Sequence, residues 1–293
     1  MINYNTKAWL SSIFFFKKAD TLRQLFPMIV LVSGYTWLIV YIEVDWLRLP
    51  DTSAIKHFTI LQALLGFVIS MLLVFRTNTA YDRWWEGRKL WGALVNNSRN
   101  LAIKINAMLP HSDTKNRHFF RKIIPMFADV LQYHLRAETT RLQLDTDPHS
   151  EIPELDNTKH IPNQVAGLIA TKLSLLHREG TISGEQLIVL NTEMQSFLDI
   201  CGACERIKNT PIPYSYSVFV KKFIFIYIIT LPLGYALSLH YLLIPIVALV
   251  FYVLASLEMV AEEIEDPFGH DDNDLPMTKI AGNIKRNIED ILS

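Results

Sequence analysis

Cysteine and glycine are scarce in this chain, and several motifs that depend on particular residues are missing. Only two cysteines occur among the 293 residues, so a disulfide framework is not indicated. Glycine contributes 11 residues, and no GxxxxGK[ST] phosphate-binding loop occurs. The 9 histidines form neither an HExxH pair nor a Cys/His array typical of zinc sites. These absences argue against a nucleotide-driven pump and against a zinc enzyme of the HExxH type.

A surplus of basic residues is also missing. The formal net charge is -1, whereas binding to nucleic acid requires clustered positive charge, so we expect no nucleic-acid partner. Charged residues make up 19% of the chain and are distributed unevenly. They are dense between Arg76 and Lys222, which predicts that this middle region faces water.

Long runs without Asp, Glu, Lys or Arg are abundant. The run Phe223–Leu257 has about 35 residues, roughly twice the length that one helix needs to cross a bilayer, so it should cross twice with a turn near His240 and Pro245. Two further runs, Gln24–Ile42 and Phe58–Phe75, are each close to one crossing. Core helices of a soluble protein normally show a polar stripe, which these runs lack. We therefore predict an integral membrane protein with four transmembrane helices.

Basic residues beside the runs predict the topology. Lysine and arginine next to a membrane helix favour the cytoplasmic side, and they precede the first run, follow the second and precede the third. Both termini should therefore be cytoplasmic. No secretory cleavage pattern is present, so we expect the first crossing to remain in the protein. The basic residues used here are Lys17, Lys18, Arg23, Arg76, Arg83, Lys221 and Lys222.

The water-facing region is predicted to be helical. Helices are expected over Arg117–Glu138, Val165–Glu179 and Ser183–Lys208, the last with a capping box formed by Ser183 and Gln186. Prolines interrupt Thr139–Gln164, which is expected to be an irregular loop. No segment alternates as a strand does, so the fold class is all-α.

These patterns divide the chain into four parts. Residues 1–79 hold an N-terminal segment with transmembrane helices 1 and 2, and residues 80–220 form a large helical cytosolic region. Residues 221–258 hold transmembrane helices 3 and 4, and residues 259–293 form an acidic cytosolic C-terminal segment.

Aromatic and basic residues follow the second run closely. Tyr81, Arg83, Trp84 and Trp85 are typical of a membrane-interface belt, in which rings lie at headgroup depth and cations reach lipid phosphate. The alternative is that these rings pack between cytosolic helices.

Within the second run, Phe67, Met71 and Phe75 recur at every fourth residue and therefore share one helical face. Presented to a common axis by several subunits, that face would form an apolar constriction that gates ions by dewetting. The alternative is that the spacing has no meaning, because nearly every face of a membrane helix is apolar.

Two polar patterns also suggest chemistry. The acidic stretch from Glu258 to Asp274 surrounds a Pro-Phe-Gly turn and offers oxygen ligands for a divalent cation; the alternative is a solvated helix end. Cys201 and Cys204 have the spacing of a thiol redox pair, but they lie late in a predicted helix, which favours small packing residues instead.

Three stretches together resemble the bestrophin family, in its bacterial branch: Phe75–Trp91, Arg206–Pro213 and Asp266–Asp274. The resemblance implies a homopentameric ion channel in the bacterial inner (plasma) membrane, with a multi-pass membrane part in the lipid bilayer and one pore on the fivefold axis. It implies passive conduction of monovalent ions and no enzymatic activity. No cofactor is required.

The resemblance also implies roles for particular residues. The family's hydrophobic neck aligns with Phe67, Met71 and Phe75, and its cytosolic aperture with Glu185. A ring of glutamates attracts cations, so we expect a cation preference such as sodium; the alternative is a chloride or other anion-selective channel of the same family. The calcium clasp of animal relatives aligns with Asp271 and Asp274, so a divalent cation, Ca²⁺ or Zn²⁺, is a candidate ligand.

Two rival functions have their own sequence signals. A secondary transporter would use a broken helix near the membrane midplane, and Pro232 with Gly234 is the candidate break. A membrane thiol oxidoreductase would use Cys201 and Cys204.

Overall fold

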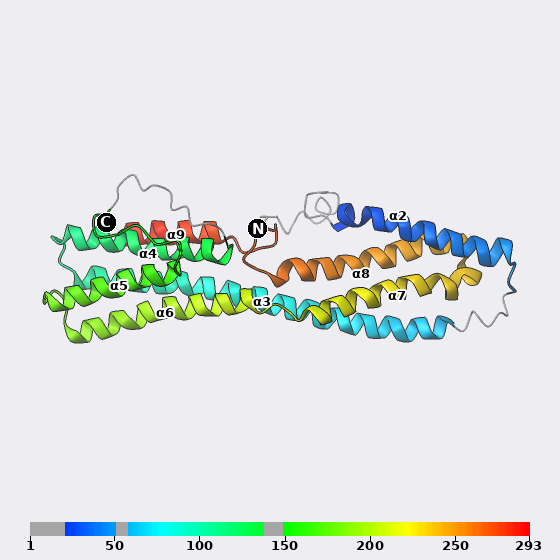
Figure 1. The fold of residues 1–293 in the computed structure, drawn as a ribbon, viewed down its shortest axis with the longest axis horizontal. Helices are drawn as coiled ribbons and strands as arrows, with labels where there is room; N and C mark the ends of the chain where they lie inside the picture. The colour runs from blue at the N-terminus through cyan, green and yellow to red at the C-terminus, as the bar shows by residue number, and fades with distance from the viewer. Residues whose placement is uncertain (1–20, 51–57, 138–148) are drawn as a thin grey trace. The chain divides into compact units, whose positions relative to one another are not determined.

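The computed structural model describes residues 21–50, 58–137 and 149–293, and the regular elements in these ranges are all helical (Figure 1). The all-α prediction is confirmed for this part of the chain. The predicted loop Thr139–Gln164 and the N-terminal segment fall partly outside it. The elements are α2 (Thr21–Val40), η1 (Tyr41–Trp46), α3 (Phe58–Met108), α4 (Thr114–Leu135), α5 (Ile161–Arg178), α6 (Gly184–Asn209), α7 (Tyr214–Leu239), η3 (His240–Leu242), α8 (Leu243–Glu265) and α9 (Met277–Ile291).

The chain forms two compact units. Unit 1 contains the described residues up to Arg83, together with Pro211–Glu265 and Asp271–Asn273. Unit 2 contains Trp84–Thr210, Asp266–His270 and Asp274–Ser293 as far as they are described. Helix α3 runs from Phe58 to Met108 without an interrupting proline and contributes to both units.

Unit 1 is a bundle of α2, α7, α8 and the first part of α3 (Figure 1). Its core consists of aliphatic side chains such as Val40, Ile69 and Val247. Helix α7 continues through Pro232, so the candidate break of a secondary transporter is not observed there. A Cβ atom at Gly234 would lie 3.2 Å from the backbone nitrogen of Thr59, which shows that the glycine permits close packing of α7 on α3.

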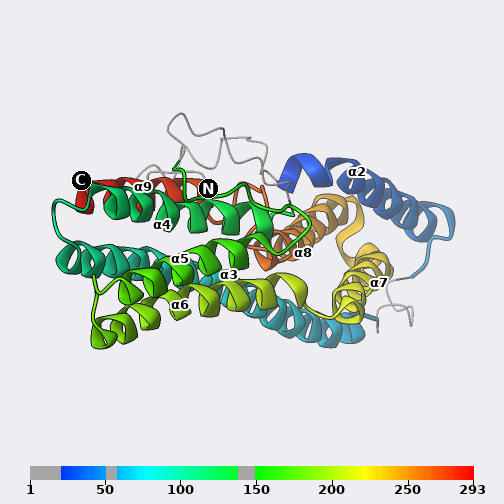
Figure 2. The same cartoon turned by 60° about the vertical axis from the view of Figure 1, so that its left-hand side comes forward.

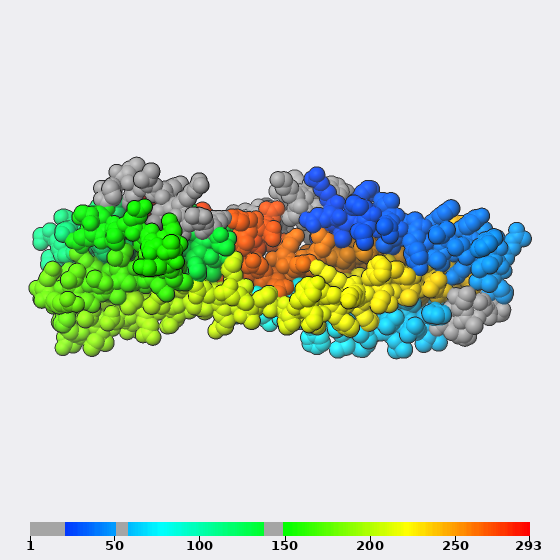
Figure 3. Space-filling view, in the orientation of Figure 1, coloured from blue at the N-terminus to red at the C-terminus, as the bar shows by residue number. Residues whose placement is uncertain are grey.

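Three helical stretches of the described chain are long and apolar enough to cross a membrane: Thr21–Trp46, Phe58–Met108 and Tyr214–Glu265. The third contains both α7 and α8, joined by η3. Large apolar side chains cover the surface of these helices, and Figure 3 shows α2 (blue), α7 (yellow) and the start of α3 (cyan) at that surface. Exposed examples are Phe26, Leu31, Leu64, Phe225, Ile226 and Leu249.

The first apolar stretch extends further than its charges suggested. The run Gln24–Ile42, predicted as one crossing, stops before Glu43, but Glu43 and Asp45 both lie in η1, a π-helical continuation of α2. The Glu43 side chain is turned inward and is 5% exposed, so this charge does not mark the start of a water-exposed segment. Asp45 accepts a hydrogen bond from the Tyr241 hydroxyl, so the end of η1 and the connection between α7 and α8 meet at one end of unit 1.

Unit 2 contains α4, α5, α6, α9 and the second part of α3 (Figure 2). Its large core is mainly aliphatic and includes aromatic rings such as Trp91 and Phe197. The three predicted helices correspond to α4, α5 and α6, and the capping box of Ser183 with Gln186 is present. Helix α9 was not anticipated within the acidic C-terminal segment. It forms because Met277, Ala281, Ile284 and Ile288 share one face, which is buried against α4 and other parts of the core.

Candidate functional site

The predicted neck residues lie on one exposed face of α3. Phe67, Met71 and Phe75 are 67%, 45% and 59% exposed, whereas Ile69 and Leu73 on the other side are buried. The spacing of four residues places the three side chains above one another along the helix. This face is therefore available to lipid or to another copy of the chain.

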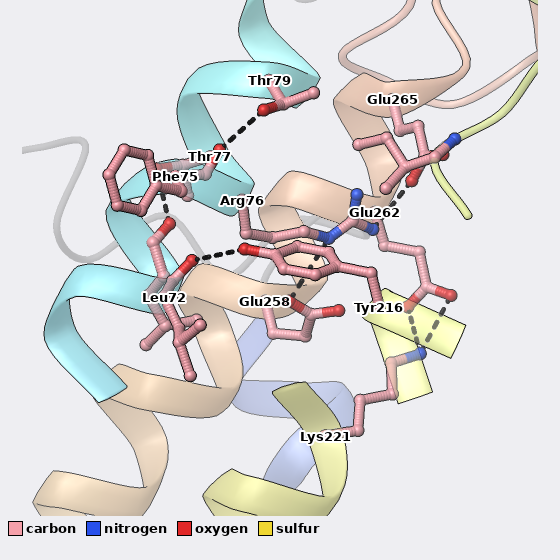
Figure 4. A network of polar contacts seen from close by, with 12 residues as sticks. Leu72, Phe75, Arg76, Thr77, Thr79, Tyr216, Lys221, Glu258, Glu262 and Glu265 are labelled. Carbon is pink, nitrogen blue, oxygen red and sulfur yellow. Dashed lines mark hydrogen bonds and ion pairs between the residues drawn. The ribbon is translucent and has the colours of Figure 1, made fainter. Parts of the chain in front are cut away.

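A buried charge follows the last neck residue directly. Arg76 is 1% exposed, and Figure 4 shows its guanidinium and the Phe75 ring pointing to opposite sides of α3. Its Nε lies 3.6 Å from Glu258 Oε2, and its Nη2 lies 2.7 Å from Glu265 Oε2. Both glutamates belong to α8. The cluster thus fixes α8 against α3 next to the predicted neck.

Further hydrogen bonds anchor the helices around Arg76 (Figure 4). The Tyr216 hydroxyl of α7 donates to the Leu72 carbonyl at 3.2 Å, and the other carboxylate oxygen of Glu265 accepts from the Ile212 amide at 2.7 Å. Arg83 Nε donates to the Glu265 carbonyl at 3.0 Å. Helices α3, α7 and α8 are therefore locked in register beside Phe75. The sequence offered one signal for this cluster: Arg76 directly follows the run Phe58–Phe75, and Glu258 directly follows the run Phe223–Leu257.

The residues predicted as an interface belt have different surroundings. Tyr81 and Trp85 are exposed, as membrane-interface rings would be in an isolated chain. Arg83 contacts the end of α8, and Trp84 packs against the core of unit 2. Partial burial of Trp84 agrees with the alternative of packing between helices, and a lipid contact of Tyr81 and Trp85 stays a prediction.

Glu185 lies in the first turn of α6 and is exposed. The Ser183 hydroxyl donates to its Oε2 at 2.7 Å and holds the pKa of Glu185 below its usual range. The side chain therefore carries a full negative charge at neutral pH. The exposed Ile188 lies one turn further along the same face. A ring of such carboxylates stays a prediction.

The two predicted clasp residues differ in burial. Asp274 is 2% exposed, and its Oδ2 lies 2.8 Å from the position of a Cβ atom on Gly269, whereas Asp271 is exposed. The turn before them is held by Phe268, which is buried against Gly87 of α3. Among the described residues, neither aspartate belongs to a group of three His, Cys, Asp or Glu side chains close enough to hold a metal. Binding of a divalent cation there stays a prediction.

The two cysteines are buried in α6 as free thiols. Burial, with the nearby Glu205 carboxylate, raises the pKa of Cys201 to about 12, and burial also raises the pKa of Cys204. A thiol that stays protonated is a poor nucleophile. The geometry therefore favours packing over redox chemistry.

Comparison with known proteins now identifies the family. The family described as bacterial and fungal bestrophin proteins matches residues 1–290. The chain belongs to this family.

Curated relatives of this bestrophin include two bacterial proteins. A voltage-dependent anion channel-forming protein of Nostoc sp. is 38% identical over 78% of this chain and 76% of the relative. The voltage-dependent anion channel-forming protein YneE of Escherichia coli K12 is 33% identical over 76% of this chain and 73% of the relative.

A solved bacterial bestrophin homolog from Klebsiella pneumoniae, crystallised as a point mutant, has a TM-score of 0.80 to this bestrophin at 24% identity. The similarity covers 92% of this chain and 100% of that chain, and it shows the shared fold.

Proposed function

We propose that this chain is one subunit of a homopentameric, passive ion channel whose pore neck is formed by Phe67, Met71 and Phe75. The observation that carries the proposal is the exposed apolar face of α3 beside the buried Arg76 cluster. Membership of the bestrophin family and the channel names of its relatives support a channel and not an enzyme.

Four crossings explain the helices of unit 1. Helices α7 and α8 are about 39 Å and about 34 Å long at 1.5 Å per residue, so each alone exceeds the ~30 Å hydrocarbon core. The contact between Asp45 and Tyr241 supports a topology in which both connections lie on one side of the membrane. The termini then lie on the other, cytoplasmic side of the bacterial inner membrane, as the basic residues predict.

The neck works by excluding water. Five copies of α3 around an axis would present rings of Phe67, Met71 and Phe75, none of which offers a hydrogen bond to a dehydrating ion. Narrowing such a ring expels water and stops conduction, and slight widening restores it. Met71 is the most flexible of the three side chains and would set the width of the middle ring.

The charge selectivity follows from Glu185. An exposed and ionised carboxylate on each subunit attracts cations to the cytosolic mouth and repels anions. We therefore propose conduction of monovalent cations. A second candidate is an anion-selective channel of the same family, which is favoured by the names of the Nostoc and Escherichia coli relatives.

One recording separates these functions. Purified protein is reconstituted in planar bilayers between two concentrations of KCl, and we expect single-channel steps that reverse near the potassium equilibrium potential. Glu185→Gln should move the reversal potential toward zero, whereas Glu289→Gln, which removes another exposed carboxylate on α9, should not. Reversal near the chloride potential in the native protein would establish the second candidate. Saturable flux without current steps would indicate a transporter instead.

The role of Phe67 in the neck is tested by shortening its side chain and measuring the current. Phe67→Ala should raise the conductance or the open probability because it widens an apolar ring. The matched control is Leu31→Ala, which shortens an equally exposed apolar side chain on α2 that lies outside the proposed neck. Identical currents in both variants would remove Phe67 from the pore.

A further inference from the structure

Three side chains with metal-binding atoms converge in unit 2, and the proposed pore does not use them. His134 lies in the last turn of α4, His160 is the N-cap of α5, and Glu205 lies in α6. Each His Nε2 lies 2.6 Å from Glu205 Oε1, and the ligand atoms of the three residues all lie within 4.8 Å of one another. Three helices thus meet at one carboxylate oxygen.

The donor set determines which ion fits. Two imidazole nitrogens and one carboxylate oxygen form a ligand set typical of Zn²⁺ with one open position. We propose that His134, His160 and Glu205 bind one Zn²⁺ per subunit, with water as the fourth ligand. The ion would link α4, α5 and α6 within unit 2. This site is distinct from Asp271 and Asp274 and does not depend on ion conduction.

The side chains need only small adjustments to accept the ion. Tetrahedral ligands about 2.0–2.1 Å from zinc lie about 3.3 Å from one another. Each nitrogen must therefore move away from the Glu205 oxygen by about 0.7 Å. All three side chains are half-buried, with 28–32% of each side chain exposed, so the ion can reach them from solvent and the fourth position can hold water.

Zinc would change the tautomer of His160. In the structure, His160 Nδ1 accepts a hydrogen bond from the Asn163 amide at 3.2 Å, so the ring proton sits on Nε2 and is donated to Glu205. An ion bound at Nε2 displaces that proton to Nδ1. The N-cap hydrogen bond is then exchanged for a metal–nitrogen bond.

The two roles of His160, metal ligand and N-cap, can be separated by one substitution. His160→Asn removes the ligand but keeps an N-cap acceptor, because asparagine is among the best N-cap residues. His134→Gln and Glu205→Gln remove the other two ligands. His111→Gln is the matched control, since His111 is exposed and outside the group.

The experiment uses the full chain in detergent, stripped with chelator and titrated with ZnCl₂ against a competing chromophoric chelator. We expect the native protein to bind one zinc per subunit and to melt at a higher temperature with zinc than without it. His111→Gln should bind zinc as the native protein does. Each ligand variant should weaken binding by about 100-fold or more, because even outer-shell partners of a metal contribute 10–100-fold. Co²⁺ in place of zinc should give the absorption of a tetrahedral nitrogen and oxygen site without a thiolate band.

Two results would overturn the proposal. In one, the stripped native protein binds zinc no more tightly than His160→Asn does. In the other, zinc binds stoichiometrically but all three ligand variants retain it, which would place the ion elsewhere. Neither result bears on the channel, because no current is measured.

Discussion

Unit 1 and unit 2 both have apolar cores, but they differ in the side chains that cover their surfaces and in the charges that they enclose. Unit 1 exposes large apolar groups such as Phe67 and encloses the charges of Arg76 and Glu258, whereas unit 2 encloses Trp91 and Phe197. In water the hydrophobic effect drives apolar groups inward, but lipid gives no such drive between helices. Polar contacts between helices then define register because hydrocarbon offers them no other partner. The difference identifies which unit is built for lipid.

The largest difference in stability should be between Phe→Ala at a buried position and Phe→Ala at an exposed position. Phe197 is fully buried with its ring 5.0 Å from that of Phe127, so Phe197→Ala should lower the free energy of unfolding by about 3–5 kcal/mol. Phe67→Ala should lower it by less than about 1 kcal/mol, because this exposed side chain leaves no cavity. Chemical denaturation in detergent measures both. Equal losses would contradict the assignment of Phe67 to an open face.

A comparable loss should follow removal of the buried charge in unit 1. Arg76→Met leaves Glu258 and Glu265 without their cation and should cost about 3–5 kcal/mol. Lys221→Met breaks an exposed pair with Glu262 and should cost about 1 kcal/mol or less. Thermal melting of the two variants gives the comparison. If Arg76→Met is as stable as Lys221→Met, the cluster does not hold the helices together.

A smaller effect is expected at an ion cluster of unit 2. Hydrogen bonds from Lys115 and Lys172 lower the pKa of Glu151 to about 2, below the ~4.3 of an unfolded chain. A lowered folded pKa contributes stability above pH ~4.3 that is lost as the pH falls toward about 2. Glu151→Gln should cost about 1–2 kcal/mol at pH 7 and flatten the acid limb of the stability curve. An unchanged acid limb would contradict this role.

The smallest effect should come from the capping box of α6. Ser183→Ala removes the acceptor of the Gln186 amide and should cost about 1 kcal/mol. It also removes the hydrogen bond to Glu185, so the pKa of Glu185 should rise toward its ordinary value. Titration of the reversal potential in the variant measures this shift. Ser183→Thr keeps the hydroxyl and serves as the control.

Local patterns in the sequence predicted much of the fold. The sequence predicted helices α4, α5 and α6 and the Ser183 cap. These features depend on hydrophobic periodicity and on capping residues, and both involve residues that are close together in the sequence. The extent of η1 and the existence of α9 were missed. A buried Glu43 and a helix that completes the core of unit 2 depend on partners distant in the sequence.

The candidate sites divide in the same way. The face of Phe67, Met71 and Phe75 can be read from a spacing of four residues within one helix. The pairings around Arg76 and Glu205 could not be predicted from local patterns. Arg76 and Glu258 are about 180 residues apart, and Glu205 is 71 and 45 residues from His134 and His160.

Apolar run length by itself determined that this protein has membrane helices, since the thickness of hydrocarbon sets the length of a crossing. Only the tertiary structure decided which charges are enclosed and which apolar faces stay open. A side chain's partner across a helix interface depends on the packing of both helices, and neither local sequence contains that information.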